Sequence, residues 1–175
     1  YPGCEAPALS HVDFTIEEGA FVLLCGASGS GKSTLLKLIA GLYAPQAGRI
    51  MVDGRDAEQM GVDELRTRLS YMSQDSHIFQ GTLRENVAYG KPGAGDGEIA
   101  AKLRDAGLGD WLAGLPQGLD TPLGDMGSIL SGGQRQRISM ARCMIHDAPL
   151  FLLDEATSAL DNQTEREVLE TLGKL

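Results

Sequence analysis

The chain has 175 residues, of which 42% are hydrophobic, and a formal net charge of −9 at pH 7. This length fits one domain with its own core, and the acidity argues against a nucleic-acid partner, whose binding surfaces are basic. No hydrophobic run approaches the roughly 18 residues of a spanning helix, and Cys4, Cys25 and Cys143 lack the spacing of a metal site or disulfide framework.

The chain opens with an aromatic residue and a candidate strand. Residues 8–16 alternate loosely between hydrophobic and polar side chains, which predicts an antiparallel strand with Val12, Phe14 and Ile16 on one face. Tyr1 is able to stack on a nucleobase, although a tyrosine in this position is more commonly a plain surface residue.

Residues 26–33 fit the phosphate-binding pattern G-x-x-x-x-G-K-[ST]. Its glycines let the backbone turn so that N–H groups converge on phosphate oxygens, and the lysine and serine serve the β- and γ-phosphates and magnesium. Residues 21–25 predict a buried parallel strand before the loop, and residues 35–40 a helix after it. A Gly/Ser-rich turn that happens to precede Lys-Ser is the alternative. The predicted nucleotide-binding residues are Gly26, Ala27, Ser28, Gly29, Ser30, Gly31, Lys32, Ser33 and Thr34.

Short strands and a helix are expected next. Residues 49–53 predict a strand ending in an Asp-Gly hairpin turn, residues 62–69 a helix and residues 69–72 another strand. Gln74 follows that strand, where its amide oxygen can face a bound metal. A solvated loop residue is the ordinary interpretation of a lone glutamine.

Residues 82–146 predict a helical region. Thr82 as N-cap and Glu85 three residues later form a capping-box pattern. Residues 98–106 and 110–115 are amphipathic, and a turn-rich loop over residues 121–127 follows. The expected core face comprises Leu108, Trp111, Leu112 and Leu115.

A second anion-binding segment precedes the helix predicted over residues 135–145. Ser131, Gly132, Gly133 and Gln134 offer free amides at the positive end of a helix dipole, unless they form a simple helix-entry turn. One nucleotide cannot obviously use two such segments of one monomer. The pattern therefore favours a two-fold dimer in which each segment faces the partner's nucleotide.

Residues 150–153 form a hydrophobic strand that ends in two carboxylates. A P-loop needs an acidic partner for magnesium, and Asp154 fits that role. Glu155, the next residue, is placed to accept a proton from an attacking water. A turn at residues 158–161 and a helix over residues 163–172 are expected to follow.

Taken together, these motifs resemble the ATP-binding cassette, the motor domain of ABC transporters, over the whole chain. Their number and their order make the resemblance specific. In the first half of the chain, Tyr1 matches the A-loop aromatic, residues 26–34 match Walker A and Gln74 matches the Q-loop. In the second half, residues 130–134 match the LSGGQ signature and residues 150–154 match Walker B. Glu155 then matches the catalytic glutamate, and residues 158–161, which include Asp161, match the D-loop.

The resemblance implies an α/β fold of the P-loop NTPase type. One cassette over residues 1–175 would have a RecA-like core with a mixed or parallel sheet, residues 1–81 and 147–175, and an N-terminal antiparallel β part. An inserted helical signature subdomain would span residues 82–146.

The resemblance also implies a mechanism. Two cassettes would close head to tail on two ATP–magnesium units, in contact with a transmembrane domain at the cytoplasmic face of the membrane. Ser33, Gln74 and Asp154 would serve magnesium, residues 131–134 would cap the partner's γ-phosphate, and Glu155 would polarise water.

Two stretches resemble exporter-type cassettes, residues 79–86 and the X-loop at residues 121–127. Asp125 and Met126 stand where those exporters usually carry Glu and Arg, which weakens the exporter assignment and puts an X-loop ion pair in doubt. An importer cassette, a soluble non-transport cassette and a binding module without hydrolysis are the alternatives.

The family's switch histidine is expected on a strand after the D-loop helix, and none of the three histidines follows residue 161. We therefore expect a C-terminally truncated cassette that lacks the strand between the Walker A and Walker B strands. It would gain a substitute strand, for example from a second copy, or bind ATP in a loosened fold without efficient hydrolysis.

Overall fold

The computed structural model describes residues 7–155 and residues 166, 170 and 173. The chain divides into two compact units, Tyr1–Thr67 and Arg68–Leu175, and each is described by itself. Expectations for Tyr1, for the turn with Asp161 and for most of the helix over 163–172 fall outside the described residues. The expected division into a core and a helical subdomain stays a prediction. None of the described helices is both long enough and hydrophobic enough to cross a membrane.

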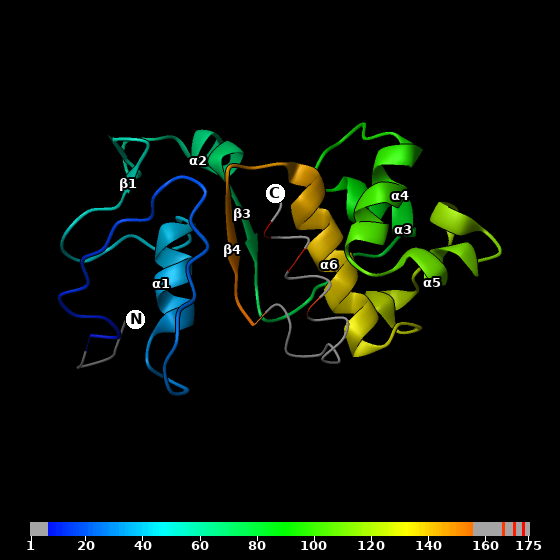
Figure 1. Cartoon of the computed structure of the whole chain (residues 1–175), viewed down its shortest axis with the longest axis horizontal. Coiled ribbons are helices and arrows are strands. Elements are labelled where there is room, and N and C mark those ends of the chain that lie inside the picture. The colour runs from blue at the N-terminus through cyan, green and yellow to red at the C-terminus, as the bar shows by residue number, and fades with distance from the viewer. Residues whose placement is uncertain (1–6, 156–165, 167–169, 171–172, 174–175) are drawn as a thin grey trace. The chain divides into compact units, whose positions relative to one another are not determined.

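The first unit contains two helices and a small hairpin (Figure 1). Strands β1 (Met51–Val52) and β2 (Arg55–Asp56) pair antiparallel. Both residues of the predicted Asp-Gly turn have positive φ, 50° and 74°, as a two-residue hairpin turn requires. The helices are α1 (Lys32–Ile39) and α2 (Val62–Arg68), whose last residue belongs to the second unit.

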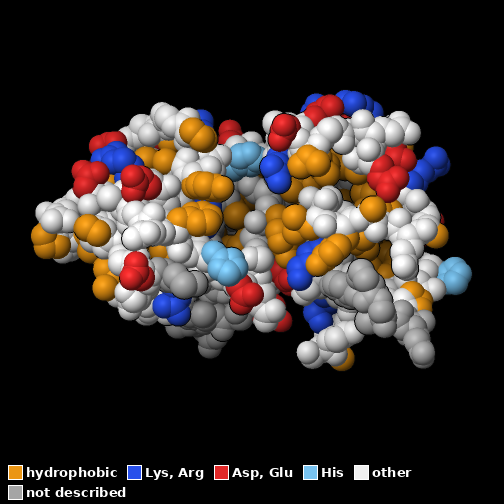
Figure 2. Space-filling model, turned by 180° about the vertical axis from the view of Figure 1, so that it is seen from behind, with side chains coloured by type: hydrophobic (Ala, Val, Ile, Leu, Met, Phe, Trp, Pro, Cys, Tyr) orange, Lys and Arg blue, Asp and Glu red, His pale blue; other side chains and the backbone are white. Residues whose placement is uncertain are grey.

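Two expected strands of the first unit do not form. Residues 8–16 and 21–25 are irregular, so both predictions are wrong. Side chains of the second run are exposed, with Phe21 at 66% and Leu23 at 75%. A hydrophobic run becomes a strand only where another segment satisfies its backbone groups, and no described segment of this unit pairs with either run. Hydrophobic side chains accordingly reach the surface, as the face in Figure 2 illustrates.

The second unit is built on a pair of parallel strands. Strand β3 (Leu69–Met72) pairs with β4 (Leu150–Leu153), and Leu69 lies opposite Leu150 in this register. Residues 21–25 join no described sheet. That another copy supplies a strand stays a prediction.

Helix α6 (Gly132–His146) packs against β3. At its C-terminal end, the Ser70 hydroxyl of β3 donates to the Cys143 carbonyl at 3.1 Å and lies 3.1 Å from Nδ1 of His146. These contacts attach the last turn of α6 to the strand pair.

The remaining elements of this unit are α-helices, as predicted, and two 3₁₀ turns. The α-helices are α3 (Leu83–Ala88), α4 (Asp96–Asp105) and α5 (Gly109–Ala113), and two 3₁₀ turns follow, η1 (Gly118–Asp120) and η2 (Asp125–Gly127). The predicted capping box is confirmed, because the Thr82 side chain accepts from the Glu85 N–H and the Glu85 carboxylate accepts from the Thr82 N–H.

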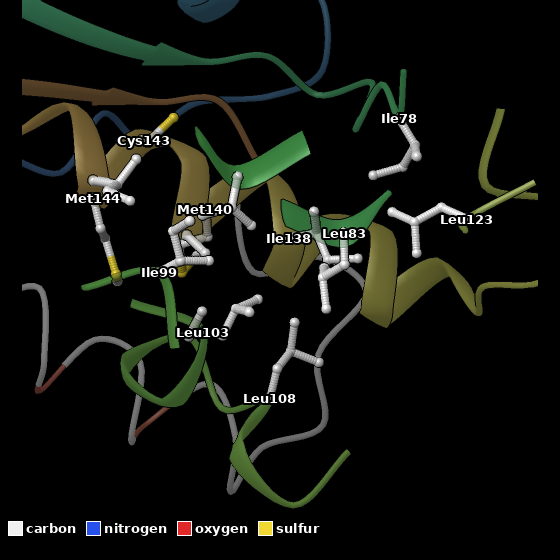
Figure 3. Close-up of a cluster of buried hydrophobic side chains, with 14 of the residues drawn as sticks. Ile78, Leu83, Ile99, Leu103, Leu108, Leu123, Ile138, Met140, Cys143 and Met144 are labelled. Carbon is white, nitrogen blue, oxygen red and sulfur yellow. The ribbon is translucent and has the colours of Figure 1, made fainter. Parts of the chain in front are cut away.

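The core of the second unit lies where α3, α4 and α6 meet, and their hydrophobic side chains point toward one another (Figure 3). Full burial of one such side chain contributes roughly 1.5–3 kcal/mol. Leu108 is buried as predicted, whereas Trp111, Leu112 and Leu115 are partly buried against this core. Its fully buried members include Leu83, Val87, Ile99, Leu103, Leu108, Leu123, Ile138, Met140, Met144 and Ile145.

Candidate functional site

The glycine-rich loop runs into α1 through left-handed backbone. Gly29 has φ 80° and Gly31, the N-cap of α1, has φ 93°. A Cβ at Gly31 would lie 2.8 Å from the Ala8 carbonyl oxygen and 2.7 Å from Cδ2 of Leu9. The conformation and the space therefore both require glycine at this position.

The lysine of the motif lies against its own loop. Its ammonium, at Lys32, donates to the carbonyl oxygens of Gly26 at 2.8 Å and Ala27 at 2.9 Å. The loop is further closed by the Ser30 N–H, which donates to the Ala27 carbonyl at 3.2 Å. The loop thus brings a positive charge to the N-terminus of an eight-residue helix, whose dipole also favours an anion.

The predicted metal-binding residues fall in different units. Ser33 lies on α1 of the first unit, whereas Gln74 and Asp154 follow β3 and β4 in the second. Asp154 is 5% exposed, and its N–H donates to the Met72 carbonyl at 2.9 Å, which continues the strand pairing by one step.

The structure brings Gln74 and Glu155 together. The Gln74 Nε2 donates to Oε2 of Glu155 at 2.7 Å. The cause is topological: β3 and β4 are parallel, so the residues after their carboxyl ends meet at one edge of the sheet. The pair joins an amide to the carboxylate that is predicted to be the catalytic base.

The signature segment forms a second capping box. The Ser131 hydroxyl accepts from the Gln134 N–H at 3.2 Å, and the Gln134 Oε1 accepts from the Ser131 N–H at 2.9 Å. The N–H groups of Gly132 and Gly133, in the first turn of α6, have no intrahelical partner. These two amides are the groups that the segment can offer to an anion.

The sequence patterns did not predict a polar cluster around Asn86. The Asn86 side chain, 1% exposed, donates to the carbonyls of Phe79 at 2.9 Å and Thr82 at 3.0 Å. Its oxygen accepts from the Phe79 N–H at 2.8 Å and from Arg142 of α6 at 3.1 Å. The bond to Arg142 joins residues 56 positions apart, so no local sequence pattern predicts it.

Arg142 fixes the segment that follows Gln74 to α6. Its guanidinium also donates to the backbone oxygens of His77 at 2.9 Å and Asn86 at 2.8 Å, and lies 4.6 Å from the ring centroid of Phe79. Burial lowers the pKa of Arg142 from its ordinary value.

The side chains suit magnesium better than a metal held by protein alone. Within residues 7–155 and the three later described residues, no three His, Cys, Asp or Glu side chains gather as a metal-binding group. Magnesium is typically bound through one or two carboxylates and completes its shell with phosphate oxygens and water. A hydroxyl, an amide oxygen and one carboxylate fit that need.

Comparison with known proteins supports the resemblance seen in the sequence. The family model described as "ABC transporter" matches residues 9–158. The ATP-dependent lipid A-core flippase of Chromobacterium violaceum is 45% identical over 175 residues, which cover 100% of this chain and 30% of the relative. The heterocyst differentiation ATP-binding protein HepA of a Nostoc species is 46% identical over 167 residues, 95% of this chain and 28% of the relative.

A solved structure agrees. The structure of a bacterial Atm1-family ABC exporter with ATP bound matches at a TM-score of 0.82 and 42% identity, covering 85% of this chain and 26% of that one. The expected fold class is thereby confirmed. The chain spans about 30% of the length of the curated relatives it matches. Together, the family match over residues 9–158 and the likeness to a solved exporter show that this chain belongs to the ABC transporter family.

Proposed function

We propose that this chain is the ATP-binding and ATP-hydrolysing part of an exporter-type ABC transporter. The observation that carries the proposal is the contact between the Gln74 amide and the Glu155 carboxylate at 2.7 Å, at the ends of two parallel strands. The relatives named as flippases and the solved exporter favour the exporter type over an importer or a soluble cassette.

The glycine-rich loop binds the phosphates of ATP. Lys32 exchanges the carbonyls of Gly26 and Ala27, which it now contacts, for phosphate oxygens that carry full charge. The amides of residues 27–34 supply the remaining donors, and Tyr1 stacks on the adenine.

Ser33, Gln74 and Asp154 would hold magnesium together with phosphate oxygens. When bound, it neutralises charge that develops on the phosphate during transfer. Asp154 is buried at the end of β4, which keeps its carboxylate in one place. Gln74 donates its N–H to Glu155 and so turns its oxygen toward other partners.

Glu155 acts as the general base. Water attacks the γ-phosphorus, its proton passes to the Glu155 carboxylate, and the bond from the γ-phosphorus to the bridging oxygen breaks to give ADP and phosphate. The Gln74 amide fixes the direction of the carboxylate while the proton moves.

The partners are a second cassette and the transporter's transmembrane domain, at the cytoplasmic face of the membrane. The Gly132 and Gly133 amides of one cassette, with Ser131 and Gln134, cap the γ-phosphate held by the other, and Asp161 lines the same interface. ATP-dependent dimers of the Glu155→Gln protein in sedimentation are the expected observation. Monomers with saturated nucleotide sites would contradict the dimer.

The hydrolytic role is tested in the full-length transporter in lipid. Glu155→Gln should lower ATP turnover at least about 100-fold, because it removes the base, and leave ATP affinity within about twofold. Glu18→Gln makes the same chemical change at an exposed carboxylate without a proposed role, and should turn over normally. Undiminished hydrolysis by Glu155→Gln would refute the proposal.

A further inference from the structure

Gln136 of α6 holds the backbone of Glu155. Its side chain is buried, 3% exposed, and its Nε2 donates to the Glu155 carbonyl oxygen at 2.9 Å. The two residues are 19 positions apart, so helix α6 and the end of β4 meet at this bond. None of the roles proposed above uses Gln136.

The backbone that Gln136 contacts is in an uncommon conformation. Glu155 has φ 51°, a left-handed value that non-glycine residues seldom adopt. Such a conformation costs free energy and persists only where its surroundings impose it, most often at functional sites. The carboxylate of a residue with positive φ leaves the chain in a different direction from that of an extended residue. The backbone conformation therefore decides where the base lies.

Three hydrogen bonds impose this conformation. The Asp154 N–H is fixed to the Met72 carbonyl at 2.9 Å, which keeps the chain in register with β3 up to that point. Beyond it, Gln136 holds the carbonyl of Glu155 and Gln74 holds its carboxylate. Gln74 acts on the side chain, whereas Gln136 acts on the main chain from a buried position on α6.

We propose that Gln136 is a positioning residue for Glu155: it keeps the backbone of the base in its left-handed conformation and thereby aims the carboxylate at the attacking water. The inference rests on the proposed function. It also joins two parts of the site, because α6 begins at the signature segment. The signature segment, which caps the partner's nucleotide, and the base, which acts on the cassette's own nucleotide, are then linked within one unit through the bond from α6 to Glu155.

The test uses ATP turnover by the full-length transporter in lipid, measured from pH 8 to pH 6 with wild type in parallel. Gln136→Glu replaces the amide donor by a carboxylate of nearly the same size. At pH 8 it should lower kcat roughly three- to tenfold, the effect of one hydrogen bond, and leave KM for ATP within about twofold. Burial at this position raises the pKa of the introduced carboxyl, so the carboxyl protonates as the pH falls. Its O–H can then donate to the carbonyl, and the ratio of variant to wild-type kcat should rise.

Ser139→Ala is the matched control, since Ser139 is a buried polar residue of the same helix whose hydroxyl has no hydrogen-bond partner in the described part. The ratio of its kcat to the wild-type kcat should stay near one at every pH. A pH-independent ratio for Gln136→Glu, or a change in KM alone, would overturn the inference.

If Gln136→Glu fails to fold, Gln136→Met decides. Methionine keeps the length of the side chain but has no hydrogen-bond donor. A lower kcat with retained ATP affinity would support the positioning role of Gln136, and an unchanged kcat would overturn it. The two proposals fail differently. Undiminished ATP turnover by Glu155→Gln would refute the role of Glu155 as the base. If Glu155→Gln is inactive but the Gln136 variant turns over normally, only the positioning role of Gln136 is refuted.

Discussion

Replacing Asn86 by alanine should destabilise the second unit more than any exposed substitution. The side chain is 1% exposed and takes part in four hydrogen bonds of 2.8–3.1 Å with Phe79, Thr82 and Arg142. At about 1 kcal/mol net for each bond, the free energy of unfolding should fall by about 3–5 kcal/mol. With a urea m-value of about 2 kcal/mol/M, the midpoint should move down by about 2 M.

The measurement is urea unfolding of the 175-residue chain followed by fluorescence of Trp111, its only tryptophan, which packs against the core of the same unit. Asn86→Asp is the control. Asn86→Asp keeps the side-chain oxygen that accepts from Phe79 and Arg142, but its second oxygen cannot donate to the carbonyls of Phe79 and Thr82. Its free energy of unfolding should therefore lie between those of wild type and Asn86→Ala. A midpoint within about 0.3 M of wild type for Asn86→Ala would show that the cluster does not stabilise the unit.

Three further outcomes follow. Gly31→Ala should weaken ATP binding at least about tenfold in a fluorescent-nucleotide titration, because its Cβ meets the Ala8 carbonyl in a left-handed conformation; normal affinity would refute the need for glycine. Ser131→Ala removes an N-cap and should cost about 1 kcal/mol in urea unfolding, whereas no change would refute the capping box. Burial raises the pKa of Cys143 to about 11, so its thiolate is scarce at pH 8, and iodoacetamide should label exposed Cys25 but not Cys143 unless the chain is unfolded; mass spectrometry distinguishes the two sites.

The sequence predicted those elements whose signals are local. The capping box at Thr82, the Asp-Gly hairpin and the strand over residues 69–72 depend on neighbouring residues, and all three are confirmed. The helix predicted from residue 135 begins earlier, at Gly132, because Ser131 and Gln134 cap it.

Features that depend on distant partners were missed or wrong. Residues 21–25 have a strand's composition but no partner in their unit, so the hydrophobic pattern alone gave the wrong structure. Arg142 and Gln136 look like ordinary polar residues of a helix. Only the packing of α6 against β3 and the end of β4 turns them toward His77 and Glu155.

The way α6 is anchored has a mechanical consequence. Its 15 residues make a rod of about 22 Å, and its C-terminal turn is tied to β3 through Ser70 while its first turn carries the signature amides. A tilt of about 5° about the C-terminal turn moves the first turn by about 2 Å, more than half the length of a hydrogen bond. The reach of Gly132 and Gly133 toward a nucleotide therefore depends on the Ser70 contact at the far end of the helix as well as on the Gln136 bond near its start. Small packing changes around Ser70 thus become differences in whether those amides engage.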